Sequence, residues 1–273
     1  MKRALSAAVF LPIFWVIVKK LGPAPYNLMI LAAAIVALGE FYRLAGAGGH
    51  RCHLALGGLL MLLILNPVPH YAGLPLEAVL ALGLLALPLA SLRRRGDWRP
   101  ALGDVATTLF GASFVGILFG YLVRLRVLDE GLRGEETGSD LVFLLFFVVW
   151  SSDVAAYYVG SAWGRRPLAP SVSPRKTIEG AAGGVAGALV AAFIAKGWFM
   201  RRLSVGDCLA LGTSLPLIGI LGDLVESMFK RGAGVKDSAT LVPGHGGILD
   251  RVDSLLYAAP VLYYYYVLAM RSS

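Results

Sequence analysis

The sequence predicts an all-α fold: a polytopic integral membrane protein with about nine transmembrane helices. Of its 273 residues, 57% are hydrophobic and 15% are charged, whereas soluble domains are about half apolar and about a quarter charged. The mean hydropathy is +0.71, and the apolar residues gather in long stretches that approach the roughly 20 residues needed to cross a bilayer. In lipid each segment must satisfy its own backbone polar groups, which favours helices. The period-two alternation of a membrane barrel is absent.

Nine apolar stretches are separated by polar loops. They cover residues 4–18, 25–46, 53–69, 73–91, 101–123, 140–161, 179–199, 205–226 and 248–270. The third stretch, 53–69, is short for a membrane span. The first has a basic start and an apolar centre, as a signal peptide has, but KKLGPAPYN follows it without a small-x-small cleavage site. We therefore expect a retained first helix.

The distribution of Lys and Arg predicts the orientation. The N-terminus and the loops after the second, fourth, sixth and eighth stretches carry more of these residues than the opposite side. The positive-inside rule then places the N-terminus and those loops in the cytoplasm. The net charge of +8 is spread over several loops, which argues against a nucleic-acid module and allows contact with anionic lipid. Cys52 and Cys208 lie far apart and are expected to be structural thiols.

We treat residues 1–273 as a single membrane domain, with few motifs in 1–139 and most of them in 140–273. Pairs of carboxylates mark two predicted helix ends within the second part. They are Asp223 and Glu226 in GDLVES, and Asp250 and Asp253 in ILDRVD. Each pair has i,i+3 spacing, which places both members on one helical face. Four carboxylates held together need cations, and hard oxygen ligands of this kind suit magnesium.

The loop between these helices combines cations with glycines. They are Lys230, Arg231 and Lys236, followed by His245 among Gly244, Gly246 and Gly247. Glycines allow a ligand close to the backbone, and successive N–H groups can form an anion nest. Carboxylates for a metal and cations for phosphates are the equipment of nucleotidyl or phosphoryl transfer.

A second polar segment on the same predicted side is SPRKTIEG. Lys176 suits a phosphate, while Ser173, Thr177 and Glu179 are either substrate-binding residues or the start of a helix. Asp153, in the sixth stretch, either pairs structurally or reaches the site. Both alternatives remain open from the residues alone.

The run from Ser227 to Asp253 resembles the signature of the phosphatidate cytidylyltransferase family, also called CDP-diacylglycerol synthases. The pattern is Ser-x-x-Lys-Arg, four residues, Lys-Asp, then Pro-x-His-Gly-Gly, two residues and Asp-Arg-x-Asp, and each position is filled. SPRKTIEG is similar to the family's Ser-Pro-Lys-Lys-Thr-x-Glu-Gly, with Arg175 at a usual lysine and Ile178 where an aromatic residue is common. The motifs cover residues 150–253, and the first half resembles the family only in hydropathy.

The resemblance implies that CTP and phosphatidic acid give CDP-diacylglycerol and pyrophosphate. The candidate catalytic residues are Asp223, Asp250, Asp253, Lys230 and Arg231. The candidate substrate-binding residues are Ser173, Lys176, Thr177, Glu179, Lys236, Asp237, His245, Gly246, Gly247 and Arg251. The candidate metal ligands are Asp223, Asp250 and Glu226. The resemblance also implies Mg²⁺, with K⁺ as a second candidate cation, a homodimer among membrane lipids, and a multi-pass protein of the inner (plasma) membrane whose active site faces the cytoplasm.

The same residues argue against other classes of membrane protein. A polyprenol kinase would share carboxylates and basic loops, but the complete Lys-Asp…His-Gly-Gly…Asp-Arg-x-Asp run argues against it. The Asp-Gly-x-x-Ala-Arg motif of a CDP-alcohol phosphotransferase is missing. A transporter would place carboxylates along a path near the bilayer midplane, whereas these gather at one edge. A scaffold without activity would not need the motif.

Overall fold

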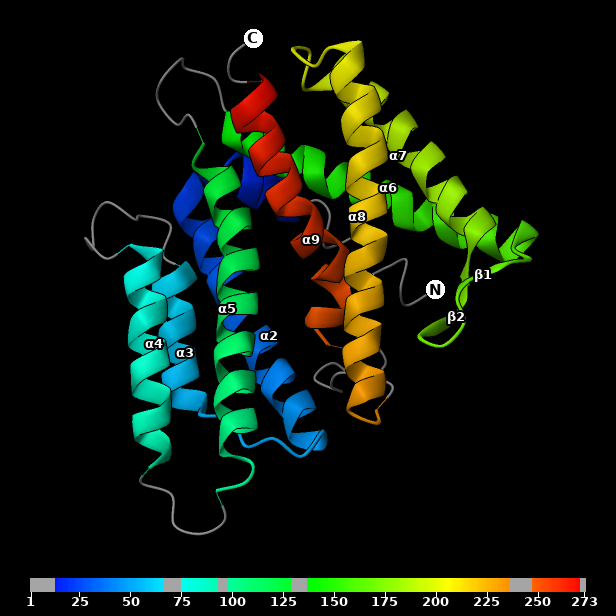
Figure 1. Ribbon diagram of the computed structural model, residues 1–273. Helices are drawn as coiled ribbons and strands as arrows, with labels where there is room; N and C mark the ends of the chain where they lie inside the picture. The colour runs from blue at the N-terminus through cyan, green and yellow to red at the C-terminus, as the bar shows by residue number, and fades with distance from the viewer. Residues whose placement is uncertain (1–12, 66–74, 93–97, 129–136, 236–246, 271–273) are drawn as a thin grey trace. The chain divides into compact units, whose positions relative to one another are not determined.

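The computed structural model describes residues 13–65, 75–92, 98–128, 137–235 and 247–270. Its helices are α2 (Pro23–Ala47), α3 (Leu54–Leu65), α4 (Leu76–Ser91), α5 (Ala101–Arg126), α6 (Thr137–Trp163), α7 (Ile178–Trp198), α8 (Val205–Gly232) and α9 (Leu249–Tyr265), which continues as a π-helical turn, η1 (Tyr266–Met270) (Figure 1). Two short strands, β1 (Pro167–Ala169) and β2 (Ser173–Thr177), separate α6 from α7. The first and last residues of each described helix lie close to those of one predicted apolar stretch.

Helix lengths and exposed side chains confirm an integral membrane protein. Within the described part of the chain, α2, α5, α6, α7 and α8 are long and apolar enough to cross a membrane. α3 and α4 have 12 and 16 residues, and at about 1.5 Å per residue they fall short of a 30 Å core. Residues 66–69 of the predicted stretch 53–69 lie outside the described residues. Large apolar side chains such as Leu102 and Leu28 are 81% and 67% exposed, as lipid-facing residues are.

The chain forms two compact units. The first contains residues 1–30, 122–222 and 254–273, and the second contains residues 31–121 and 223–253. The boundaries fall within helices, so the second unit receives the last turns of α8 and the first turn of α9.

In the first unit, α6 and α7 pack closely because small residues face each other. A Cβ added to Gly187 would lie 2.5 Å from Ala155 Cβ, and one added to Gly183 would lie 2.5 Å from Val159 Cβ. Small residues at such positions allow membrane helices to approach closely. The pair forms a rigid base for the polar segment that connects the two helices.

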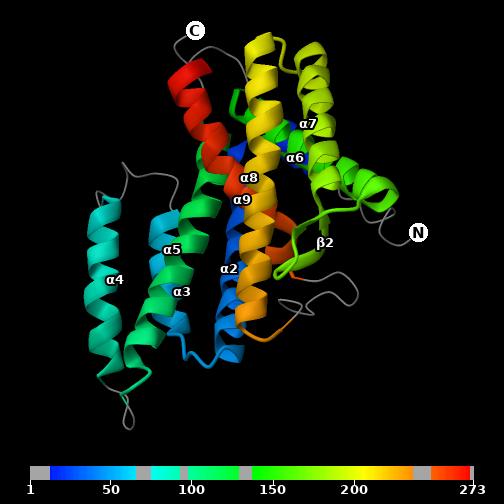
Figure 2. The ribbon, with the colours of Figure 1, turned by 45° about the vertical axis from the view of Figure 1, so that its right-hand side comes forward.

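That connecting segment, predicted as a loop, is an antiparallel hairpin. Pro167 lies opposite Thr177, and Ala169 lies opposite Ser173 (Figure 2). Thr177 then becomes the N-cap of α7, because its Oγ1 accepts a hydrogen bond from the Gly180 amide at 3.1 Å. This bond supports the helix-start interpretation of Thr177.

In the second unit, an aromatic cluster joins α2, α5 and the end of α8. It consists of Phe41, Phe110, Phe114 and Phe229. The rings of Phe110 and Phe114 stack at 5.6 Å, and the Phe229 ring stands edge-on 6.0 Å from Phe41. Offset and edge-on pairs of this kind are favourable beyond the area they bury. The cluster fixes the rotation of α2 and α8, which carry Glu40 and Lys230 beside these rings.

Gly111→Ala should destabilise this unit. A Cβ at Gly111 would lie 2.6 Å from both Phe41 Cδ1 and Tyr42 Cε1. The Tyr42 ring has little freedom to move, because its hydroxyl donates to the Thr108 carbonyl at 2.8 Å. Overpacking of this kind costs about 1–3 kcal/mol, which thermal unfolding in detergent would detect.

The matched control is Gly58→Ala in α3, where an added Cβ meets nothing within 4 Å. There the change should be neutral or stabilising by up to ~1 kcal/mol, because alanine loses less backbone entropy in a helix. Equal melting temperatures for the two variants would contradict the packing argument.

Candidate active site

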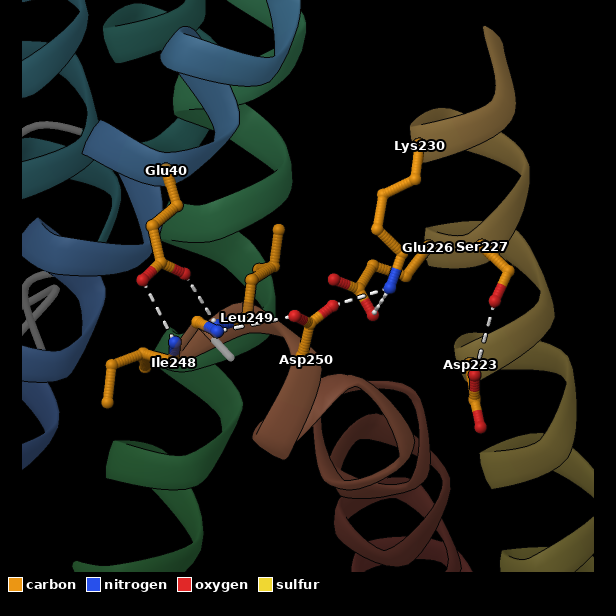
Figure 3. A network of polar contacts seen from close by, with 9 residues as sticks. Glu40, Asp223, Glu226, Ser227, Lys230, Ile248, Leu249 and Asp250 are labelled. Carbon is orange, nitrogen blue, oxygen red and sulfur yellow. Dashed lines mark hydrogen bonds and ion pairs between the residues drawn. The ribbon is translucent and has the colours of Figure 1, made fainter. Parts of the chain in front are cut away.

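Three charged side chains meet where the end of α8 faces the start of α9. Lys230 Nζ lies 2.5 Å from Asp250 Oδ1 and 3.4 Å from Glu226 Oε2 (Figure 3). Glu226 and Lys230 are one helical turn apart, so they share a face of α8. The side chains of Glu226, Lys230 and Asp250 are 4%, 13% and 19% exposed. The sequence-predicted residues Glu226, Lys230 and Asp250 are therefore brought together.

This group carries one more carboxylate than cation among its three members. Neither oxygen of Glu226 has a hydrogen-bond partner within the described residues, although both are buried. A buried carboxylate without hydrogen bonds is costly unless a cation neutralises it, and the 3.4 Å ion pair with Lys230 is shared with Asp250. The donor set of Glu226 and Asp250 therefore fits a hard divalent cation, which takes one or two carboxylates together with substrate oxygens.

The other two predicted carboxylates are placed differently. Asp253 lies one turn beyond Asp250 on α9 and is near enough to Glu226 to interact with it electrostatically. Asp223 lies further back on α8, where Ser227 Oγ is 3.5 Å from its Oδ1, and its carboxylate points away from Asp250 (Figure 3). In the described part of the chain, no group of three or more His, Cys, Asp or Glu side chains is arranged as a metal site. Asp223 thus stays a predicted ligand.

The start of α9 is held by two carboxylates. Asp250 Oδ2 accepts from the Gly247 amide at 3.2 Å, within the same segment. Glu40, in α2, accepts from the amides of Ile248 and Leu249, each at 2.9 Å. These amides are among the donors that a helix N-terminus leaves without an intrahelical partner.

Glu40 was not among the site residues predicted from the sequence. Its side chain comes from the predicted stretch 25–46 and is fully buried. The available signal was its charge, because ionisable residues inside membrane segments are functional candidates by default.

The residues of the SPRKTIEG segment belong to the first unit. Ser173 and Lys176 lie in β2, and Thr177 caps α7. Glu179 Oε2 accepts from the amides of Arg165 and Arg166 at 3.0 and 3.1 Å, so it anchors the residues that follow α6. These contacts give Thr177 and Glu179 structural roles. Asp153 is exposed on α6 of the same unit.

The remaining candidates divide into two sets. Arg231 and Arg251 are exposed, at the end of α8 and the start of α9. Lys236, Asp237, His245 and Gly246 lie outside the described residues.

An apolar pocket of about 500 Å³ lies in the second unit. Its lining comes from α2, α5, α8 and the residues that follow α2, and it includes Phe41, Phe110, Met228, Phe229 and His50. Phe229 precedes Lys230 in the chain, and Phe41 follows Glu40. Two lining residues are thus sequence neighbours of Lys230 and Glu40, and an apolar pocket in the same unit can take the apolar part of a ligand.

Membrane helices, paired carboxylates at two helix ends and a basic, glycine-rich loop define a membrane-bound nucleotidyl- or phosphoryl-transferase. The model of the cytidylyltransferase family matches residues 1–269, and the chain belongs to that family.

Curated relatives are similar over most of the chain. A phosphatidate cytidylyltransferase of Bacillus subtilis is 36% identical over 264 residues, 95% of this chain and 93% of the relative. The Staphylococcus epidermidis protein of the same name is 34% identical over 267 residues, 95% and 96% of the two chains. The Haemophilus influenzae protein of that name is 48% identical over 163 residues, 58% of this chain and 56% of its own. The similarity thus extends to the half of the chain that carries few motifs.

Proposed function

We propose that this chain transfers CMP from CTP to phosphatidic acid, giving CDP-diacylglycerol and pyrophosphate for phospholipid biosynthesis. The observation that carries the proposal is the buried Glu226–Lys230–Asp250 group in a membrane protein of the cytidylyltransferase family. The names of the relatives, phosphatidate cytidylyltransferases, support the choice of phosphatidate as acceptor. The apolar pocket supports it too, since phosphatidic acid has acyl chains beside its phosphate.

The chemistry requires no nucleophile from the protein. An oxygen of the lipid phosphate attacks the α-phosphorus of CTP, one P–O bond forms, and the bond from the α-phosphorus to the bridging oxygen breaks. Pyrophosphate leaves with the electron pair of that bond. Both reactants are anions, so the protein must hold them together and offset their repulsion.

The chain offers two kinds of group that offset this repulsion: cations that bind the phosphates directly, and carboxylates that would hold a metal ion. Lys230, as an ammonium ion held near two carboxylates, is a point charge suited to a phosphate oxygen. Arg231 and Arg251, exposed at the two helix ends, add guanidinium groups that bind phosphates with two hydrogen bonds. Glu226 and Asp250 would hold Mg²⁺, which when bound stabilises developing charge on the phosphoryl oxygens. We propose Asp223 as a further ligand and K⁺ as a second cation on the sequence resemblance.

Orientation and assembly are part of the proposal. The excess of Lys and Arg in the loops beside the site supports a cytoplasm-facing active site in the inner (plasma) membrane. The proposal that the protein forms a homodimer is supported by the family resemblance alone.

The testing experiment incubates purified protein with phosphatidic acid, labelled CTP and Mg²⁺, and follows label into the lipid phase. We expect lipid-linked cytidine, with pyrophosphate formed in equal amount, and loss of at least ~100-fold in rate when EDTA removes the metal. Label from the γ-phosphate on a polyprenol would identify a kinase instead. Ion flux in liposomes without CTP turnover would identify a transporter. Activity that EDTA leaves unchanged would contradict the metal assignment.

A further inference from the structure

We propose that Glu40 is a positioning residue, whose carboxylate holds the N-terminus of α9 so that Asp250 stays opposite Glu226 and Lys230. The inference rests on the proposed function, because it assigns Glu40 a role in the same site. Glu40 lies in the part of the chain that carries few motifs.

The contact is bidentate and buried. Glu40 Oε1 accepts from the Ile248 amide and Oε2 from the Leu249 amide, both at 2.9 Å, across 208 and 209 positions of sequence (Figure 3). The Glu40 side chain is 0% exposed, and Leu249 is 1% exposed. The carboxylate is therefore shielded from water, and without it both amides would lose the acceptors that they have among the described residues.

The contact lies next to the reacting residues. Asp250 follows directly after the two clamped amides, and its own Oδ2 accepts from the Gly247 amide that precedes them. Four consecutive residues, 247 to 250, are thus fixed by two carboxylates, one from α2 and one from within the segment. A negative charge at a helix N-terminus is also favoured by the helix dipole.

Glu40 can hold α9 in place because α2, which carries it, is itself held by contacts with other helices of this unit. The neighbouring Phe41 ring packs edge-on against Phe229, which precedes Lys230 on α8. Tyr42 is tied to α5 by its hydrogen bond to Thr108. α2 therefore contacts both sides of the charged group, through Phe41 toward Lys230 and through Glu40 toward Asp250.

The first test separates positioning from folding by kinetics. In Glu40→Gln the shape is retained, but an amide can accept from only one of the two N–H groups, and its NH₂ opposes the other. We expect kcat to fall about 10- to 100-fold, as for residues that orient metal ligands. KM for CTP should change little, and more Mg²⁺ should be needed for half-maximal rate.

Asp104→Asn is the matched control. Asp104 is a carboxylate of the same unit, is 2% exposed and accepts from the Arg51 amide at 2.7 Å. The substitution removes the charge of a buried carboxylate that accepts from a backbone amide, at a place remote in sequence from the charged residues, while the asparagine oxygen can still accept from Arg51. It should lower the melting temperature and leave kcat of the folded protein unchanged.

The second test does not depend on activity. Hydrogen–deuterium exchange in detergent should show slow exchange at the Ile248 and Leu249 amides of the unaltered protein. Glu40→Ala should accelerate exchange at these two amides, and Asp104→Asn should not. Fast exchange at these amides in the unaltered protein would overturn the proposal even if no variant folds.

The outcomes are distinguishable. Faster exchange together with lower kcat supports positioning. Faster exchange with unchanged kcat would make Glu40 a structural cap and overturn the inference. Lack of CTP turnover in the unaltered protein would contradict the proposed function, and the exchange data would still decide whether Glu40 clamps α9.

Discussion

Asp250→Asn should abolish cytidylyl transfer, with a fall of roughly 10³-fold in kcat. Asp250 contributes one oxygen to Lys230 at 2.5 Å and the other to the Gly247 amide at 3.2 Å. Asparagine can keep the amide contact and fill the same space, but it loses the negative charge. The variant should therefore fold while the site loses a metal ligand and the partner of Lys230.

The measurement is CDP-diacylglycerol formation with saturating CTP and Mg²⁺, alongside thermal unfolding in detergent. Asp140→Asn is a suitable control, because Asp140 also binds a lysine, Lys19, with similar burial. It should leave turnover unaltered. Near-normal activity of Asp250→Asn would contradict the assignment of Asp250 to the metal site.

The helical framework could be predicted from the sequence because it depends on local composition. Stretches 101–123 and 179–199 became α5 (Ala101–Arg126) and α7 (Ile178–Trp198), since apolar segments in lipid have few alternatives to helix. The hairpin was not predicted, because its local composition carries no comparable signal. SPRKT has a proline and two cations, and strands of three and five residues are too short for a periodic signal.

Within the site, spacing predicted partners along one helix but not across helices. The i,i+4 relation of Glu226 to Lys230 follows from sequence. Which carboxylate of α8 faces Asp250 depends on how α8 is rotated, and the Phe41–Phe229 packing that helps set this rotation is a tertiary contact. Glu226 meets Lys230 and Asp250, while Asp223 points elsewhere. Glu40 was missed because its partners lie more than 200 residues away.

Lys230→Met should impair both activity and stability, and the loss of stability should depend on Mg²⁺. Methionine fills a similar volume but leaves the buried carboxylates of Glu226 and Asp250 side by side without their shared ammonium. Breaking a buried ion pair by removing one partner costs about 3 kcal/mol or more. Turnover should fall about 100-fold, because a phosphate-binding charge is lost.

The stability arm compares melting temperatures in EDTA and in Mg²⁺. In EDTA the variant should melt well below the unaltered protein. Mg²⁺ should raise its melting temperature more than that of the unaltered protein, because a divalent cation bound between the two carboxylates replaces the missing charge and stabilises the folded state. Lys19→Met is the matched control, since the Lys19–Asp140 pair is 14% and 22% exposed against 13% and 19% for Lys230–Asp250. It should show no such recovery.

A double variant tests whether repulsion between the carboxylates is the cause. Glu226→Gln added to Lys230→Met removes one of the two negative charges, so the double variant should be more stable in EDTA than Lys230→Met alone. The coupling should amount to about 1–3 kcal/mol, as for other residues in contact. Additive losses would mean that Lys230 stabilises α8 by packing and not by neutralising Glu226. In that case the buried carboxylate of Glu226 would no longer argue for a cation at this site.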